Sequence, residues 1–187
     1  MVDRAAQRTA TIELDRVDEK ESTFLEATLP HLDALHRVAR HLCGDHHRAE
    51  DIVQETYLRA YAAFATHNGP STRAWLLAIC VNVARSEGRR RSRRVVEEQL
   101  PAPMEPVAAG RDVAETALTR LDRDRVSQAL ARVPEEQRTA IVLMDLAGQS
   151  ASEVAGMLGC SRNTVLSRAY RGRQRLAALL EEEDVRP

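Results

Sequence analysis

The stretch SASEVAGMLGCSRNTVLSRAYRGRQRL, residues 150–176, decides the fold prediction. Ser150 stands three residues before Glu153, the spacing of a capping box in which serine and glutamate satisfy the free backbone donors of a helix start. Gly159 interrupts the pattern, and Ser161 can cap a second, longer helix. A short helix, a glycine turn and a longer helix together predict a helix-turn-helix motif.

The two faces of the second helix differ in chemistry. Val165, Ala169, Gly172 and Leu176 recur at i, i+4, i+7 and i+11, so we expect them to pack inward. The residues expected to point away from the core are Arg162, Asn163, Thr164, Ser167, Arg168 and Arg171. These residue types can bind base edges and phosphates in the DNA major groove. The alternative is an exposed amphipathic helix with incidental arginines, which the capping box, turn glycine and acid-free outer face disfavour.

The remaining sequence predicts an all-α protein of two small helical domains joined by a flexible linker. Apolar residues recur at helical spacing over residues 22–94 and 116–183, and no stretch of strand length alternates convincingly. Residues 95–115 contain three prolines and a glycine without a helical period, which predicts an extended linker. Residues 1–21 are polar and charge-dense, so we expect a disordered extension.

In the first domain, AEDIVQETYLRAYAAF (residues 49–64) places an apolar stripe on one helix face, formed by Val53, Tyr57, Ala60, Tyr61 and Phe64. The adjacent face carries Asp51, Gln54, Glu55 and Leu58. Spacing alone favours solvated acids beside a wide core stripe, and the competing interpretation is a surface for another protein.

The following helix, RAWLLAICVNVARSEGRRRSRR (residues 73–94), combines a buried side with a basic end. We expect Trp75, Ile79 and Val83 to be buried, with Leu76 and Cys80 beside them. Five arginines lie in the six positions 89–94, which favours nucleic-acid binding over a solvated helix end.

Charge balance indicates how such basic surfaces are used. The chain has 27 basic and 28 acidic side chains, for a formal net charge of -1. A free DNA-binding protein usually gains its affinity by neutralising phosphates, and is therefore net basic. We infer that DNA is bound in the company of a larger partner that holds both domains, because tethering two weak modules raises their effective concentration.

No apolar run approaches the roughly 20 residues needed to cross a bilayer, and the first residues lack the apolar core of a secretion signal. Three widely separated cysteines without a CxxC pair fit a reducing compartment. These features predict a cytoplasmic protein with no membrane insertion.

These features together resemble those of a bacterial RNA polymerase sigma factor of the extracytoplasmic-function (ECF) group. AEDIVQETYLRAY resembles sigma region 2.2, and RAWLLAICVNVARSEGRRR resembles regions 2.3 and 2.4. LARVPEEQRTAIVLMDLAGQSASEVAGMLGCSRNTVLSRAYRGRQRL (residues 130–176) resembles region 4. The order of these blocks along residues 22–180 is far more specific than a helix-turn-helix alone.

The resemblance implies roles and partners for the selected residues. The face of Asp51, Gln54, Glu55 and Leu58 would dock on the β′ clamp helices of core polymerase, and region 4 would meet the β flap. The promoter -10 element would be held by Asn68, Asn82, Arg85, Arg89, Arg90 and Arg91. The -35 element would be read by Arg162, Asn163, Thr164, Ser167, Arg168, Tyr170 and Arg171.

The resemblance also implies an anti-sigma factor as a partner, and a linker that threads along the polymerase toward its RNA channel. It implies no cofactor, no metal and no enzymatic activity. Leu166, Ala78 and Ser86 depart from residues common in the family, so base preferences at those positions do not transfer.

Parts of the sequence are also compatible with two other classes of protein. A stand-alone helix-turn-helix regulator would need a dimerisation element, which the sequence does not show. A metal or redox sensor would use the cluster His36, His41, Cys43, His46 and His47, whose residue types bind zinc. Since His36, His41 and Cys43 do not share one helical face, we disfavour this class. The sequence shows no nucleophile paired with a base, no phosphate-cradling glycine loop and no paired carboxylates, so it does not predict an enzyme.

Overall fold

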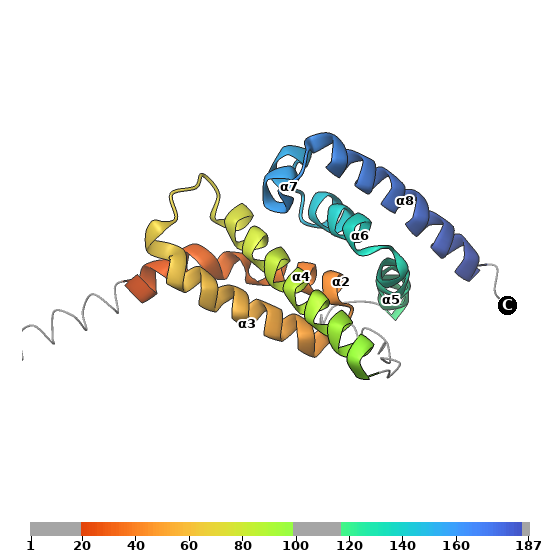
Figure 1. The fold of residues 1–187 in the computed structure, drawn as a ribbon, viewed down its shortest axis with the longest axis horizontal. Helices are drawn as coiled ribbons and strands as arrows, with labels where there is room; N and C mark the ends of the chain where they lie inside the picture. The colour runs from red at the N-terminus through yellow and green to blue at the C-terminus, as the bar shows by residue number, and fades with distance from the viewer. Residues whose placement is uncertain (1–19, 99–116, 185–187) are drawn as a thin grey trace, which may run out of the picture.

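The computed structural model describes residues 20–98 and 117–184 (Figure 1). All regular structure within these two ranges is helical, which confirms the all-α prediction. A helical segment over residues 20–28 is followed by η1 (Leu29–His31), α2 (Leu32–Cys43), α3 (His46–Ala63), η2 (Phe64–Thr66), α4 (Thr72–Glu98), α5 (Ala117–Arg132), α6 (Glu135–Ile141), η3 (Val142–Leu146), α7 (Ala151–Leu158) and α8 (Arg162–Asp184).

The turn between α2 and α3 is encoded locally. Gly44 ends α2 in the left-handed conformation, with φ 71°, a region that glycine adopts at little cost. Asp45 then caps α3, since its side chain accepts a hydrogen bond from the Arg48 backbone N–H at 2.8 Å. These two residues reverse the chain so that α2 and α3 pack side by side, with α4 against both.

The buried face of α4 differs from the predicted one. Leu76, Cys80 and Val83 are buried as predicted, and Leu77 and Val81, which were not predicted, are almost fully buried as well. Trp75 and Ile79, predicted as core residues, are only half-buried. The reason is that α4 contacts α2 and α3 and also α7 of the second helix group, which widens its buried face beyond a single stripe.

The second helix group comprises α5 to α8. Pro134 precedes α6 as its N-cap residue. Next, α6 continues into the π-helical turn η3, where the Ala147 N–H donates to the Val142 carbonyl at 2.9 Å. A bidentate ion pair joins the Asp145 carboxylate of η3 to the Arg173 guanidinium of α8, at 2.6 and 2.8 Å.

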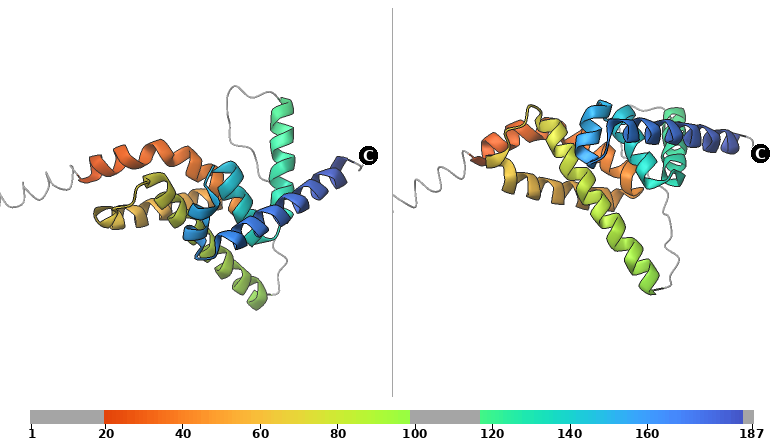
Figure 2. Two further views of the ribbon diagram at one scale, coloured as in Figure 1. Left: turned by 90° about the horizontal axis from the view of Figure 1, so that it is seen from above. Right: turned by 45° about the horizontal axis from the view of Figure 1, so that its top comes forward.

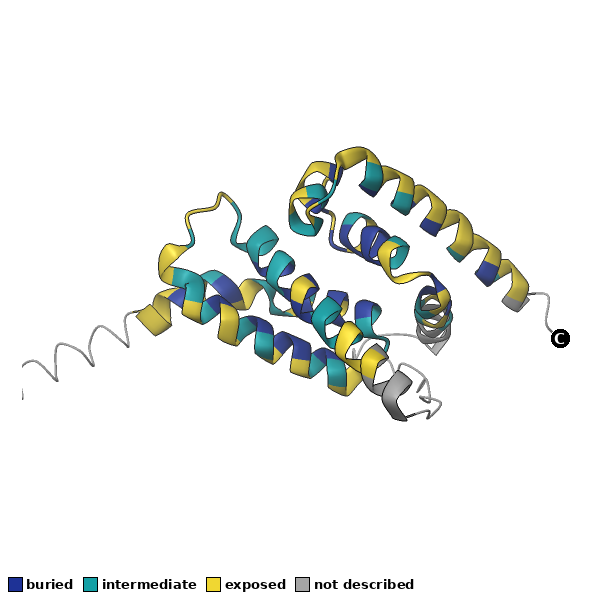
Figure 3. Ribbon diagram, in the orientation of Figure 1, coloured by how far each residue is buried: buried dark blue, intermediate teal, exposed yellow. Residues whose placement is uncertain are grey.

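The two helix groups match the two predicted domains but are packed against each other (Figure 2). One hydrophobic core runs through both groups, from Leu35 and Leu76 to Leu143, Val154 and Val165. Figure 3 shows the buried residues on the helix sides that face one another, while the outer side of α8 is exposed. The two helix groups therefore pack against each other through a shared core, an arrangement that we call closed. The sequence did not predict it.

Two helical segments run past the predicted domain limits, which remain a prediction. The helix α4 extends to Glu98, past residue 94 where we expected the first domain to end, and residues 20 and 21 are helical. The rest of the predicted linker and of the predicted extension lies outside the described residues.

Candidate polymerase and nucleic-acid interfaces

The helix-turn-helix is formed by α7 and α8, as predicted. The Glu153 N–H donates to the Ser150 hydroxyl at 3.3 Å, and the Ser150 N–H donates to the Glu153 carboxylate at 2.7 Å. These hydrogen bonds hold the pKa of Glu153 below its usual value. Gly159 ends α7 with φ 62°, and the Ser161 hydroxyl accepts from the Thr164 N–H at 3.1 Å to start α8. The capping box, turn glycine and second cap are confirmed.

The inner face of α8 is also as predicted. Val165 and Ala169 are fully buried, Gly172 is buried, and Leu176 is half-buried. At Gly172 the helix lies so close to α6 that an added Cβ would be 2.6 Å from the Ile141 Cδ1 atom and 3.1 Å from the Gln137 carbonyl oxygen. This close approach sets how α8 is presented on the surface.

The outer face of α8 is polar and open at most of the predicted positions. Arg162, Asn163, Ser167, Tyr170 and Arg171 are exposed, Tyr170 to 61%. The Arg171 guanidinium donates to the Ser167 hydroxyl and carbonyl, both at 3.3 Å, which aligns these two side chains. Such a surface can offer donors to base edges and phosphates.

Two of the predicted residues on α8 are less open. Thr164 is half-buried, and its hydroxyl shares a 2.9 Å hydrogen bond with that of Ser161. The Arg168 guanidinium turns toward α6, where it pairs with the Glu136 carboxylate at 2.7 Å. Arg168 is therefore directed toward a neighbouring helix, not outward as its helical spacing indicated, because Glu136 lies close to it in the fold.

On α3 the predicted docking face is exposed except at one position. Asp51 and Gln54 are exposed, and Leu58 is 68% exposed, a high value for a leucine. Glu55 is half-buried, and its carboxylate forms an ion pair with the Arg59 guanidinium, with 2.7 Å between Oε1 and Nε. An exposed leucine among hydrogen-bond acceptors is typical of a protein-binding surface.

Beside this face lies a groove of about 520 Å³ that the sequence analysis missed. It is lined by Leu25, Leu29, Leu32, His36, Glu50, Val53, Gln54 and Tyr57. Leu25 and Leu29 are exposed leucines one helical turn apart, and this i, i+4 spacing is the signal that could have identified them. Gln54 belongs to both the groove and the predicted face.

The predicted -10 residues are distributed along α4. Asn68 is exposed in the loop before α4, and Asn82 is exposed near the middle of the helix. Arg85 is half-buried one turn further on, and Arg89, Arg90 and Arg91 are exposed toward the carboxyl end. At 1.5 Å per residue, the helix separates its first turn from these arginines by about 27 Å. The structure thus brings these residues to one helix and its loop but does not bring them to one point.

The loop before α4 contains a ring stack that the sequence did not indicate. The His67 imidazole lies on the Trp75 indole with 4.2 Å between centroids and 13° between planes. The Nε2 atom of His67 is buried and has no hydrogen-bond partner. The stack covers part of the Trp75 indole, which is half-buried and packs against the main core.

A second groove, of about 370 Å³, is almost entirely apolar. It lies between α5, the α6–η3 segment and α8, and its lining includes Val126, Leu130, Leu146, Leu176 and Leu180. Val126 and Leu146 are exposed there. The helices that form this groove can be predicted from the sequence, but the groove itself depends on how they pack.

The alternative of a metal site gains no support from the geometry. Among the described residues, no group of three or more His, Cys, Asp or Glu side chains could hold a metal ion. The Nδ1 atom of His41 is 2.7 Å from the Arg37 carbonyl oxygen, so the ring donates a proton there. Burial lowers the pKa of His41 and raises that of Cys43.

Comparison with known families matches both halves of the chain. The Sigma-70 region 2 family matches residues 29–94, and the family "Sigma-70, region 4" matches residues 123–176. None of the helices in the described ranges has the length and apolar character needed to span a membrane.

Individual relatives agree with this result. The ECF RNA polymerase sigma factor SigE of Mycolicibacterium smegmatis is 33% identical over 94% of this chain and 69% of its own length. The ECF sigma factor EcfG of Rhodopseudomonas palustris is 36% identical over 82% of this chain and 81% of its own length.

A solved structure extends the likeness to the fold. The sigma factor RpoE of Bartonella quintana, crystallised with the anti-sigma factor NepR, aligns with a TM-score of 0.75 at 31% identity, over 85% of this chain and 97% of that one. The chain described above therefore belongs to the ECF family of RNA polymerase sigma factors. Sigma factors bind core polymerase and direct it to promoters, and they are not themselves enzymes.

Proposed function

We propose a division of labour among the surfaces of this sigma factor, in which α3 binds the polymerase and α4 and α8 bind the promoter. The observation that carries the proposal is the pair of opposite surfaces described above. An acidic face with an exposed Leu58 lies on α3, an acid-free polar face lies on the first turns of α8, and the exposed arginines 89–91 lie toward the end of α4. Surfaces of opposite charge suit a protein partner and a polyanion respectively.

The polymerase contacts divide between the two helix groups. The face of Asp51, Gln54, Glu55 and Leu58 binds the β′ clamp helices, and Leu58 supplies apolar contact at its centre. The apolar groove between α5, η3 and α8 takes an apolar element of the β flap, because its lining offers almost no polar partner. Both contacts hold the promoter-reading helices at the spacing of the two promoter elements.

The promoter contacts follow the same division. The exposed residues of α8 enter the major groove at the -35 element, and Arg171 is oriented by Ser167 for this purpose. Asn68 and Asn82 bind an unstacked base of the -10 element, and the arginines of α4 hold the adjacent backbone. Extracting a base from the duplex costs a few kcal/mol, which binding at the loop must offset.

The proposed partners indicate in which compartment the chain acts and which kind of protein regulates it. Core polymerase lies in the cytoplasm, so we infer that the chain acts there. The sigma factor RpoE was crystallised in complex with the anti-sigma factor NepR, and CnrH, which aligns at 27% identity with a TM-score of 0.64, was solved in complex with the cytosolic domain of CnrY. We infer an anti-sigma factor for this chain also, bound to its closed arrangement. A stand-alone regulator is not favoured, since both polymerase-type regions are present.

Run-off transcription with purified core polymerase and a pool of genomic promoter fragments tests the division of labour. The double substitution Gln54→Ala with Glu55→Ala is expected to abolish core binding and transcription together. The matched control is His47→Ala, an exposed α3 residue outside the docking face, which should leave both intact.

Substitution of the reader helix should separate the two activities. Arg171→Ala is expected to lower promoter-dependent transcription about tenfold or more, since a good arginine–base or arginine–phosphate contact contributes roughly 1–3 kcal/mol. Core binding, measured by native gel or fluorescence anisotropy, should not change. Equal loss of core binding would contradict the proposed roles, and Arg37→Ala on α2 serves as the control for removal of an exposed arginine.

A further inference from the structure

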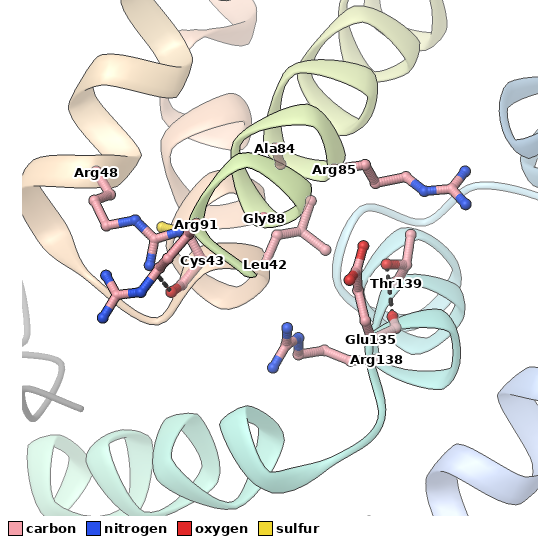
Figure 4. Close-up of a pocket in the computed structure, with 10 residues that line it drawn as sticks. All are labelled: Leu42, Cys43, Arg48, Ala84, Arg85, Gly88, Arg91, Glu135, Arg138 and Thr139. Atoms are coloured by element: carbon pink, nitrogen blue, oxygen red, sulfur yellow. Dashed lines mark hydrogen bonds between the residues drawn. The ribbon is translucent and has the colours of Figure 1, made fainter. Parts of the chain in front are cut away.

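The junction of the two helix groups contains a polar cavity, and its arginines Arg48 and Arg138 have no part in the proposed promoter or polymerase contacts. Its volume is about 220 Å³, and it lies where the end of α2, the start of α3 and the middle of α4 meet α6 (Figure 4). Because one wall comes from each helix group, this cavity exists only in the closed arrangement.

Four arginines and a single glutamate line the cavity, and Figure 4 shows the Arg85 guanidinium pointing away from those of the other three arginines. Arg48, Arg85 and Arg91 come from the first helix group, while Arg138 and Glu135 come from the second. Within the described residues, no ion pair or hydrogen bond involves the guanidinium of Arg85 or Arg91. The cavity therefore carries an excess of positive charge.

The two deeper arginines are only partly satisfied. The Nη1 atoms of Arg48 and Arg138 each donate to a backbone carbonyl, of Cys43 at 3.2 Å and of Ala131 at 3.0 Å. The Nε atom of Arg138 is buried and has no partner. Burial lowers the pKa of Arg138, Glu135 raises it, and the positive charge of Arg48 lowers it. A buried donor on a cation without an acceptor is unfavourable until an anion supplies one.

The chemistry of the cavity selects phosphate over other anions. Arginine forks bind phosphate oxygens through parallel hydrogen bonds, and several arginines together suit a group that carries several negative charges. A water molecule occupies roughly 30 Å³ in the liquid, so the cavity admits a polyatomic anion. Apolar contact is limited to the side chains of Leu42 and Ala84.

We propose that this cavity binds the phosphate groups of a small oligophosphate ligand, such as a nucleoside polyphosphate, between the two helix groups. Arg48 and Arg138 bind it from opposite walls, and the ligand therefore stabilises the closed arrangement over any open one. If the promoter contacts proposed above are correct, Arg85 and Arg91 cannot serve ligand and promoter together, and the ligand then competes with the promoter.

Calorimetric titration of the full chain with sodium tripolyphosphate tests the binding site without polymerase or promoter, so its outcome does not depend on the proposed promoter contacts. We expect saturable binding of one ligand that weakens with added salt. Arg138→Gln and Arg48→Gln should each weaken it about tenfold or more, as expected for loss of a charge-assisted contact. Arg37→Gln, an exposed arginine of α2 outside the cavity, should bind like the unaltered chain.

The two substitutions on opposite walls keep the test decisive if one variant folds poorly, which circular dichroism would reveal. Binding unchanged in a folded Arg138→Gln or Arg48→Gln variant overturns the proposal. Equal loss in Arg37→Gln also overturns it, because binding would then reflect diffuse surface charge.

A second titration separates a small ligand from the phosphates of DNA. Short duplex DNA of arbitrary sequence should bind Arg138→Gln as well as it binds the unaltered chain, since Arg138 is half-buried at the junction and not on the exposed arginine surface. If duplex binding falls in parallel with tripolyphosphate binding, the cavity is part of the nucleic-acid surface and the small-ligand proposal is wrong.

Discussion

Replacement of Gly172 by alanine tests whether α8 lies on α6 as closely as the structure places it. In an open helix, Gly→Ala is favourable by about 1 kcal/mol because alanine loses less backbone entropy. At Gly172, however, the new Cβ would lie 2.6 and 3.0 Å from two side-chain carbons of Ile141 and 3.1 Å from the Gln137 carbonyl oxygen. The Ile141 side chain can rotate, but the Gln137 oxygen belongs to the backbone of α6 and moves only with that helix.

Forcing a methyl group into such a contact typically costs about 1–3 kcal/mol. We therefore expect Gly172→Ala to change the free energy of unfolding from no net effect to a loss of about 2 kcal/mol. The matched control is Gly156→Ala in α7, where an added Cβ meets no atom within 4 Å. That substitution should stabilise the chain by up to about 1 kcal/mol.

Urea denaturation followed by circular dichroism measures both variants against the unaltered chain. The difference between the two substitutions, about 1–3 kcal/mol, isolates the cost of close packing from helix propensity. Similar slopes with urea would show that compactness of the unfolded state is unchanged. If Gly172→Ala stabilises as much as Gly156→Ala, α8 does not approach α6 at this point, and the described presentation of the outer face of α8 is wrong.

Three further predictions concern single side chains. Ser150→Ala removes the capping box and should destabilise the chain by about 1 kcal/mol in the same urea assay, whereas Ser150→Asp, which keeps an acceptor, should lose much less. Burial raises the pKa of the Cys80 thiol to about 12, so at about pH 8 iodoacetamide should label half-buried Cys160 and leave Cys80 unlabelled until urea unfolds the chain; mass spectrometry of the native protein would contradict this if Cys80 reacted first. Burial also lowers the pKa of His41, so the unfolded state takes up its proton at a higher pH than the folded state, and stability falls as the pH drops through about 6.5. Comparing urea midpoints at about pH 7.5 and about pH 5.5, His41→Gln should lose less stability than the unaltered chain, and an identical loss would refute the assignment.

Much of the fold and of the candidate site follows from interactions between residues that are close together in the sequence. The capping box at Ser150 and the turn at Gly159 depend on residues within a few positions of each other, so spacing was enough to predict them. The inner face of α8 was likewise readable, because Val165, Ala169 and Gly172 share one side of any regular helix. For the same reason helical spacing was enough to predict that Leu58 shares a face with the hydrogen-bond acceptors of α3, although its role could not be derived from spacing.

Other features of the site depend on residues far apart in the chain. Arg168 was expected to point away from the core, but Glu136 lies near it across the fold and pairs with it. The buried face of α4 was placed too far toward Trp75 and Ile79, because the contact with α7 could not be read from α4 alone. The two apolar grooves also needed the helices to be placed beside one another.

By itself, the sequence determined the all-α class, the helix-turn-helix and the chemistry of each exposed helix face, since helical periodicity and capping act within one or two turns. Only the tertiary structure decided that the two helix groups share one core and enclose four arginines at their junction. The physical reason is that burial and charge repulsion depend on which surfaces meet, and α4 meets α6 and α7 through contacts between residues distant in the chain.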